Sequence, residues 1–242
     1  MSKARELADL GSVTDKLEEV GNTDGSLSNR NLIINGAMQV AQRGTSVTGV
    51  TSSGYYTCDR WVSSVATGTF TATQGTSGPT GFPNTLKLEC TTASASAANI
   101  LLEQRIEGYN LQGLGFGTSD AKPLTLSFWV KSNVVGNYTT EFYNNDSARQ
   151  VSKVFSVDAS DVWEKKTLNI PADTSNGFGN DAGLSLYVLF WLNAATTFTS
   201  GTQNTTAWTA AVNSNRVNSD IVNIASTVGN YFQITGVQLE VG

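Results

Sequence analysis

Hydrophobic and polar residues alternate along many short segments of this chain, a pattern typical of β-strands with one buried face. The segments are rich in Val, Ile, Thr and aromatic residues, and Gly, Asn, Asp or Pro residues separate them. Candidate strands lie at residues 32–40, 56–65, 69–74, 85–91, 99–107, 124–132, 138–144, 151–157, 164–170, 184–192, 217–224 and 231–241. The main position for a short helix is 207–213.

The strands follow one another without the regular alternation of strands and helices that marks an α/β protein, so the pattern favours an all-β fold. It predicts an antiparallel β-sandwich over residues 31–242, and within that group a jelly roll. Residues 1–30 are expected to be a separate, short N-terminal helical anchor segment and linker, because residues 1–24 hold 9 of the 35 charged residues.

The sequence of the anchor segment predicts two short helices that end near Gly11 and Gly21. Its candidate residues for attachment to a particle or for oligomerisation are Leu7, Leu10, Val13, Leu17 and Val20. The last four follow the 3-4-3 spacing of a short coiled coil, which needs a partner to be stable. The partner is either sister chains or a docking surface, and the alternative is a frayed amphipathic tail.

Two of the candidate strands, 124–132 and 184–192, carry large hydrophobic residues on both faces. One face of each strand is core, and the other face is too aromatic to be an ordinary solvated surface. That second face holds Trp129 in the first strand, and Tyr187 and Trp191 in the second. If Phe142 points inward, Tyr143 and Glu141 join it, and we expect these five residues to form one covered surface: Trp129, Tyr143, Tyr187, Trp191 and Glu141.

The aromatic surface has two interpretations. Aromatic rings on a β-sandwich can stack on the apolar face of a sugar, with Glu141, Asn144 and Asn145 bonding its hydroxyl groups. The same rings are typical of a subunit interface or of a surface covered by loops. We favour this second interpretation of the aromatic surface, because no spacing in the sequence is diagnostic for sugar binding.

The amino-acid composition excludes several classes of functional site and partner. The chain has no histidine, which excludes Ser-His-Asp triads and histidine-ligated metals. Its pI near 4.7, without a basic cluster, argues against nucleic acid as a partner. We expect no membrane insertion and no signal peptide, because no apolar run is long enough and the N-terminus is charged. Charged residues make up only 14% of the chain, so hydroxyl and amide groups supply much of its polar surface.

No catalytic residue and no metal site are assigned. Carboxylates on strands usually face solvent or an arginine, so the chain is expected not to be an enzyme. Asn and Asp residues at 144–146 and 180–181 are of the type that calcium binds, so a structural calcium ion is an alternative to ordinary turn formation. Cys58 and Cys90 are expected to be buried thiols rather than a disulfide.

Several stretches together resemble a domain of tailed-bacteriophage fibre and virion proteins. They are NLIINGAMQVAQRGT at 31–45, YTCDRW at 56–61, SFWVK at 127–131, Trp163, and YFQITGVQLEVG at 231–242. The resemblance implies a jelly roll like that of carbohydrate-binding modules, in a phage particle and usually trimeric.

From the residues themselves, Asn35 and Gly36 predict a turn or bulge, and Asp59 is expected to pair with Arg60 or Arg43.

The resulting hypothesis is a non-enzymatic virion structural protein: a short trimeric tail fibre or receptor-binding protein that contacts host surface polysaccharide. Its N-terminus would hold it to other virion proteins of the tail or neck, after synthesis in the host cytoplasm without a signal peptide. The first alternative is a capsid decoration protein or head fibre, and the remote one is a glycan-degrading enzyme.

Overall fold

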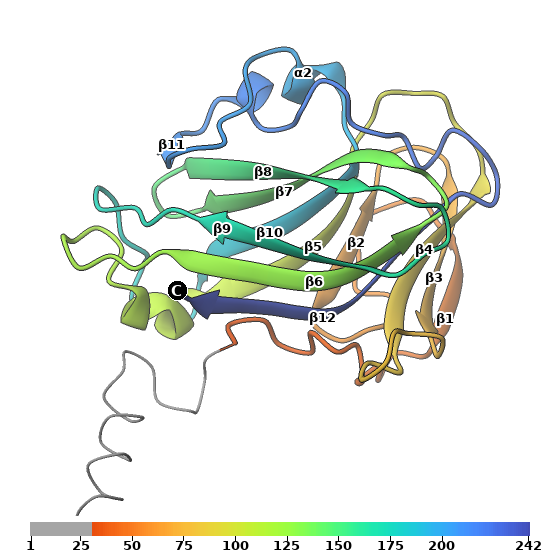
Figure 1. Cartoon of the computed structure of the whole chain (residues 1–242), viewed down its shortest axis with the longest axis horizontal. Coiled ribbons are helices and arrows are strands. Elements are labelled where there is room, and N and C mark those ends of the chain that lie inside the picture. The colour runs from red at the N-terminus through yellow and green to blue at the C-terminus, as the bar shows by residue number, and fades with distance from the viewer. Residues whose placement is uncertain (1–30) are drawn as a thin grey trace, which may run out of the picture.

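The computed structural model describes residues 31–242, and the predicted N-terminal helical anchor with its hydrophobic stripe lies outside them. Two six-stranded sheets pack face to face (Figure 1). Sheet A has the order β1-β3-β4-β12-β6-β9, and sheet B the order β11-β8-β7-β10-β5-β2. All pairings between these strands are antiparallel, so the predicted all-β sandwich of the jelly-roll type is confirmed.

The strands of sheet A are β1 (Ser46–Val50), β3 (Thr69–Gly75), β4 (Thr85–Thr92), β12 (Tyr231–Val241), β6 (Leu124–Ser132) and β9 (Glu164–Ile170). Those of sheet B are β11 (Thr209–Ala210), β8 (Arg149–Val157), β7 (Gly136–Asn144), β10 (Leu184–Asn193), β5 (Ile100–Glu107) and β2 (Trp61–Val65). The described helices are short: the 3-10 helices η1 (Gly108–Leu114) and η2 (Asn213–Asn215), and the α-helix α2 (Thr196–Thr199).

The core lies between the two sheets and is centred on aromatic rings. Phe128 of sheet A contacts Phe155 and Phe190 of sheet B, with ring centroids 5.0 and 5.1 Å apart. Tyr138 of sheet B lies 5.3 Å from Phe232 of sheet A. Because strands from both sheets supply these rings, their burial stabilises the packing of one sheet on the other.

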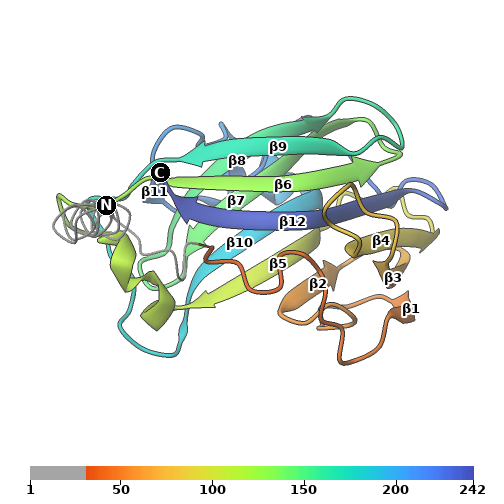
Figure 2. The same ribbon diagram turned by 60° about the horizontal axis from the view of Figure 1, so that its bottom comes forward.

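The opening and closing stretches of the described chain lie against each other (Figure 2). The Asn31 side chain donates to the carbonyl of Val237 at 3.2 Å and accepts from the N–H of Leu239 at 2.9 Å. At Gly36 an added Cβ would lie 2.0 Å from the Val237 carbonyl oxygen, so only glycine fits there. Asn31 and Gly36 thus join the start of the described chain to β12.

Four sequence predictions need correction. Residues 32–40 form turns rather than a strand, because Asn35 and Met38 have positive φ angles of 58° and 56°. Residues 56–60 are not strand either, and Arg60 has a φ of 70° just before β2. Residues 217–224 form a loop with an isolated bridge at Ile221. The expected helix at 207–213 is replaced by the short strand β11 and the start of η2.

Other expectations are confirmed. Asn35 lies in a turn, and its side-chain amide donates to the carbonyls of Val40 and Asp59. Asp59 pairs with Arg43 at 3.5 Å, whereas Arg60 pairs with Glu107. Both cysteines are buried free thiols, and burial raises the pKa of Cys58 to about 12.

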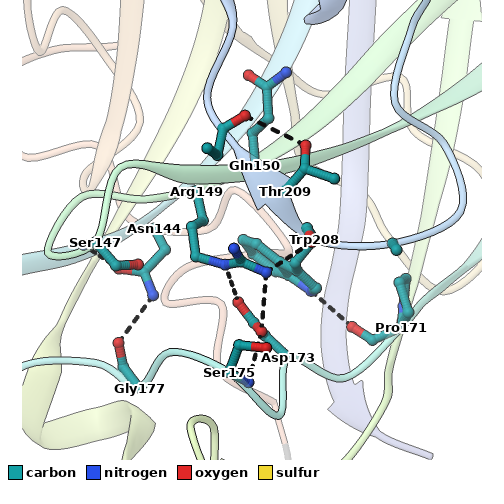
Figure 3. Close-up of polar contacts among 12 residues, drawn as sticks. Asn144, Ser147, Arg149, Gln150, Pro171, Asp173, Ser175, Gly177, Trp208 and Thr209 are labelled. Carbon is teal, nitrogen blue, oxygen red and sulfur yellow. Dashed lines mark hydrogen bonds and ion pairs between the residues drawn. The ribbon is translucent and has the colours of Figure 1, made fainter.

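One edge of sheet B is fastened to two loops by Arg149, the first residue of β8 (Figure 3). Its guanidinium donates to Asp173 at 2.6 Å and to the Trp208 carbonyl at 2.7 Å. The Trp208 indole donates in turn to the Pro171 carbonyl at 2.7 Å, and the Ser175 N–H caps Asp173 at 2.9 Å. This cluster, which we call the Arg149 lock, holds the loops after β9 and before β11 against the sheet.

Candidate functional site

The outward face of sheet B carries three rows of side chains across its central strands β7, β10 and β5. The first row is Tyr143, Tyr187 and Arg105, and the second is Glu141, Leu189 and Glu103. The third row is Thr139, Trp191 and Leu101. The pleat gives this arrangement, because every second residue of a strand points to the same face while the intervening residues, such as Phe142 and Val188, enter the core.

A long loop region between β10 and β12, residues 194–222, contains the short elements α2, β11 and η2, and part of it covers the third row. Phe198 of α2 lies 5.2 Å from the Trp191 ring, and the N–H of Val217 donates to the Phe198 carbonyl at 3.1 Å. Trp191, Leu101 and Val217 belong to a second hydrophobic cluster, separate from the core between the sheets. The predicted cover over the aromatic face is therefore supplied in part by the chain itself.

The first row is left open and forms the floor of a pocket of about 360 Å³. Sheet residues line its floor and loop residues line one wall: Asn99, Leu101, Glu103, Arg105, Tyr143, Asn145, Tyr187, Leu189, Trp191, Phe198 and Arg216. Tyr143 and Tyr187 are half-buried, and their ring centroids are 6.1 Å apart. The pocket thus combines two accessible aromatic rings with a few polar groups, which is the usual composition of a site for a small ligand.

Arg216 forms the loop-side wall of the pocket. Its guanidinium donates to both oxygens of Glu141, at 2.7 and 3.0 Å, and lies over the rings of Tyr143, Trp191 and Phe198. The Trp191 indole also donates to Glu141 at 2.8 Å. Burial raises the pKa of Glu141, and the charge and hydrogen bonds of Arg216 oppose that rise. Glu141 is therefore a fixed internal anchor for Arg216.

Arg105 lies at the opposite end of the first row. Its guanidinium donates twice to one oxygen of Glu103, at 3.2 and 2.8 Å, and its centre is 5.6 Å from the Tyr187 ring centroid. Glu103 itself is buried. The two arginines thus flank the tyrosine pair, and each is held in place by a carboxylate and by at least one aromatic face.

The structure brings together four of the five residues predicted for the aromatic surface. Tyr143, Tyr187, Trp191 and Glu141 share the outward face of sheet B, although Trp191 and Glu141 are buried. Trp129 is the correction: it lies on β6 in sheet A, where it pairs with Lys165 and Thr235. The alternation of hydrophobic and polar residues correctly predicted that Trp129 points outward, but it could not predict to which sheet the strand belongs.

Sequence reasoning missed both arginines and Phe198. Arg105 had a usable signal, because it alternates with Leu101 and Glu103 along β5 and so shares their face. Arg216 and Phe198 had none, since the long loop that carries them reaches the pocket only through tertiary contacts. Asn145 does line the pocket as proposed for a hydroxyl partner, but Asn144 is buried and donates to the Gly177 carbonyl at 3.0 Å.

Within residues 31–242, no three Cys, Asp or Glu side chains are grouped so that they could hold a metal ion. The Asp146 carboxylate, one of the turn groups considered for calcium, accepts the N–H of Gly179 at 2.7 Å. In the same part of the chain, no helix is long and apolar enough to cross a membrane.

Comparison with known proteins gives structural similarities only. No family model matches the chain, and no curated protein matches it in sequence. Three of the solved structures similar to this chain each align with most of it. A bacteriophage CBA120 tailspike protein 4 enzymatically active domain is 14% identical over 92% of this chain, with a TM-score of 0.46. The chain spans only 23% of that tailspike chain.

The other two similarities extend over nearly the whole of the matched proteins. A putative sugar binding protein from Bacteroides thetaiotaomicron is 16% identical over 88% of this chain and 100% of its own, with a TM-score of 0.48. The family 11 carbohydrate-binding module from Clostridium thermocellum, in complex with a mixed-linked tetrasaccharide, is 11% identical over 81% of this chain and 95% of its own, with a TM-score of 0.36.

Proposed function

We propose that the outward face of sheet B binds a glycan, with the pocket over Tyr143 and Tyr187 as its centre. The observation that carries this proposal is the open pair of tyrosine rings, flanked by two fixed arginines, in a pocket of about 360 Å³. An aromatic ring packs well against the apolar face of a sugar, and its hydroxyl group and the neighbouring guanidinium groups can bond sugar hydroxyls.

We infer that the pocket serves binding rather than bond cleavage. A glycoside hydrolase uses two carboxyl groups that both reach the substrate. Here the Glu141 side chain is fully buried and accepts three hydrogen bonds from Arg216 and Trp191. Glu103 is buried and bonded to Arg105. We therefore propose a non-enzymatic binding protein, with glycan degradation as the remote alternative.

The experiment compares two single variants of the full chain on a glycan array and by titration calorimetry. Tyr187→Ala removes a pocket ring, and Trp129→Ala removes a ring of similar half-burial from the outward face of sheet A. We expect Tyr187→Ala to weaken glycan binding by about tenfold or more and Trp129→Ala to leave it unchanged. Equal loss in both variants, or no glycan binding by the native chain, would contradict the proposal.

We further propose that the glycan-binding domain belongs to a phage virion, as a short trimeric tail fibre or receptor-binding protein held by residues 1–30. The support is the resemblance of 31–45, 56–61 and 231–242 to virion proteins, together with the hydroxyl- and amide-rich composition. The alternative is a capsid decoration protein, a head fibre. Labelling the chain in intact particles would distinguish these roles, since label on the tail or neck supports the first and label across the capsid the second.

A further inference from the structure

The charged groups of the pocket are layered, with the cations nearer to solvent than the anions. The Arg105 side chain is 36% exposed and that of its partner Glu103 is 10% exposed. The Arg216 side chain is 17% exposed, whereas that of Glu141 is fully buried. A ligand that enters the pocket therefore meets the guanidinium groups before it meets either carboxylate.

The hydrogen-bonding groups follow the same layering. Both oxygens of Glu141 accept bonds from inside the protein, and one oxygen of Glu103 accepts two. Of the four carboxylate oxygens, these contacts leave out Oε1 of Glu103, a buried residue. Each guanidinium has five N–H donors and cannot lose its charge, so the charged groups of the pocket offer a ligand more donors than acceptors. A ligand group that only accepts, such as a carboxylate or a sulfate, fits this imbalance best.

The row of rings and cations continues beyond the pocket. Gly54 bridges Ser63 of β2, which places the exposed Tyr55 on the far side of β2 from β5, and the Arg43 guanidinium is 5.5 Å from the Tyr55 ring centroid. Arg43 is a third outward cation, since its side chain is 54% exposed and its partner Asp59 only 17%. From β7 to β2 the row crosses three strand spacings, or about 14 Å, which is longer than one sugar ring.

We propose that the ligand is an acidic oligosaccharide whose carboxylate or sulfate groups bind Arg105 and Arg216, while its rings lie over Tyr143 and Tyr187. The chain of sugars runs across the strands toward Tyr55 and Arg43. This inference rests on the proposed glycan binding, and it adds the chemical class of the glycan. It also explains why a protein of formal net charge −5 places outward arginines along this row.

The test uses the full chain and an array of matched pairs of oligosaccharides. Each pair holds a uronic-acid-containing or sulfated oligosaccharide and the same oligosaccharide after carboxyl reduction or desulfation. We expect the acidic member of a recognised pair to bind about tenfold more tightly, with an advantage that shrinks at high salt. Preference for carboxylated or for sulfated members identifies which anion the arginines bind. Equal or better binding of the neutral members overturns the inference and leaves glycan binding itself intact, whereas no binding to any glycan overturns both.

Two variants locate the effect. Arg105→Gln removes a pocket cation. Its matched control is Lys87→Gln on β4 of sheet A, because Lys87 also pairs with a carboxylate two residues away, Glu89, and also lies over a tyrosine ring, that of Tyr231. We expect Arg105→Gln to weaken binding of the acidic oligosaccharide about tenfold and to spare its neutral counterpart. The Lys87→Gln variant is expected to change neither. If Arg105→Gln weakens both oligosaccharides equally, or if Lys87→Gln has the same effect, Arg105 does not select an acidic ligand. The comparison of paired oligosaccharides on the native chain stands even if a variant fails to fold.

Discussion

Two arginine–carboxylate pairs in this domain have almost the same geometry and very different surroundings. Arg149 lies 2.6 Å from Asp173, and Arg216 lies 2.7 Å from Glu141. The two arginine side chains are 18% and 17% exposed, and their partners 2% and 0%. The distance and burial of an ion pair therefore do not tell its role.

The surroundings distinguish the two pairs. The Arg149 guanidinium also bonds a backbone carbonyl, that of Trp208, and its neighbours are loop segments that it fastens to the sheet (Figure 3). The Arg216 guanidinium lies over three aromatic rings and lines the pocket. We infer that the Arg149 lock serves stability alone, whereas the Arg216 pair serves both stability and ligand binding. The following predictions test that division.

The largest effect is expected from Arg149→Met. It leaves Asp173 buried without a counter-charge and frees the Trp208 carbonyl, so the free energy of unfolding should fall by about 3–5 kcal/mol. Urea unfolding monitored by fluorescence measures the loss. Binding of glycan by the folded protein at low temperature should be unchanged, and a specific loss of binding would contradict the division of roles.

Arg216→Met should destabilise less, by about 2–3 kcal/mol, and should also remove glycan binding. The stability loss is smaller because burial already raises the pKa of Glu141, so that this carboxyl can take up a proton when its partner is gone. Calorimetric titration and urea unfolding of the same preparation give both values. A variant that binds glycan normally would show that Arg216 only holds the loop.

The double variant Glu141→Gln/Arg216→Met separates the two functions of that pair. Replacing the Glu141 carboxyl by an amide should restore about 1–2 kcal/mol of stability relative to Arg216→Met, because no buried carboxyl remains that must either stay charged without a partner or take up a proton. Glycan binding should stay absent. If the double variant recovers both binding and stability, the Arg216→Met variant fails to bind because it is destabilised and not because it lacks the guanidinium group.

The smallest effect concerns the two thiols. Burial raises the pKa of Cys58 to about 12 and also raises the pKa of Cys90, so neither thiol forms an appreciable thiolate near neutral pH. We expect no reaction of native protein with a thiol-specific reagent and two equivalents of reaction after denaturation. Glycan should not change either result, because both cysteines belong to the core between the sheets and not to the pocket. Rapid reaction of the native protein would contradict their placement.

The sequence predicted the sandwich well because alternation directly records which residues face the core. Phe142 illustrates this, since its predicted inward position placed Tyr143 and Glu141 correctly on the outward face. Alternation fails to tell sheets apart. Trp129 and Trp191 stand at equivalent outward positions of their strands, yet the topology puts them on opposite sides of the molecule.

Loops account for what the sequence did not predict. Residues 32–40 have the composition of a strand, but positive φ angles at Asn35 and Met38 bend them into turns that lie against β12. Arg216 reaches the pocket from a loop that has no periodic pattern, and it is held there by Glu141, a residue 75 positions away in the chain. Such long-range pairs arise from topology, which local patterns do not encode.

Tryptophan indole signals in a nuclear magnetic resonance titration test the central claim most directly. The Trp191 indole N–H donates a hydrogen bond to Glu141 at the pocket. Trp129 lies on β6 of sheet A, and Trp163 is the residue just before β9 of the same sheet. On addition of a glycan that the chain binds, the Trp191 indole signal should shift while those of Trp129 and Trp163 stay in place. Shifts at Trp129 and Trp163 with an unchanged Trp191 signal would place the binding face on sheet A and contradict the account.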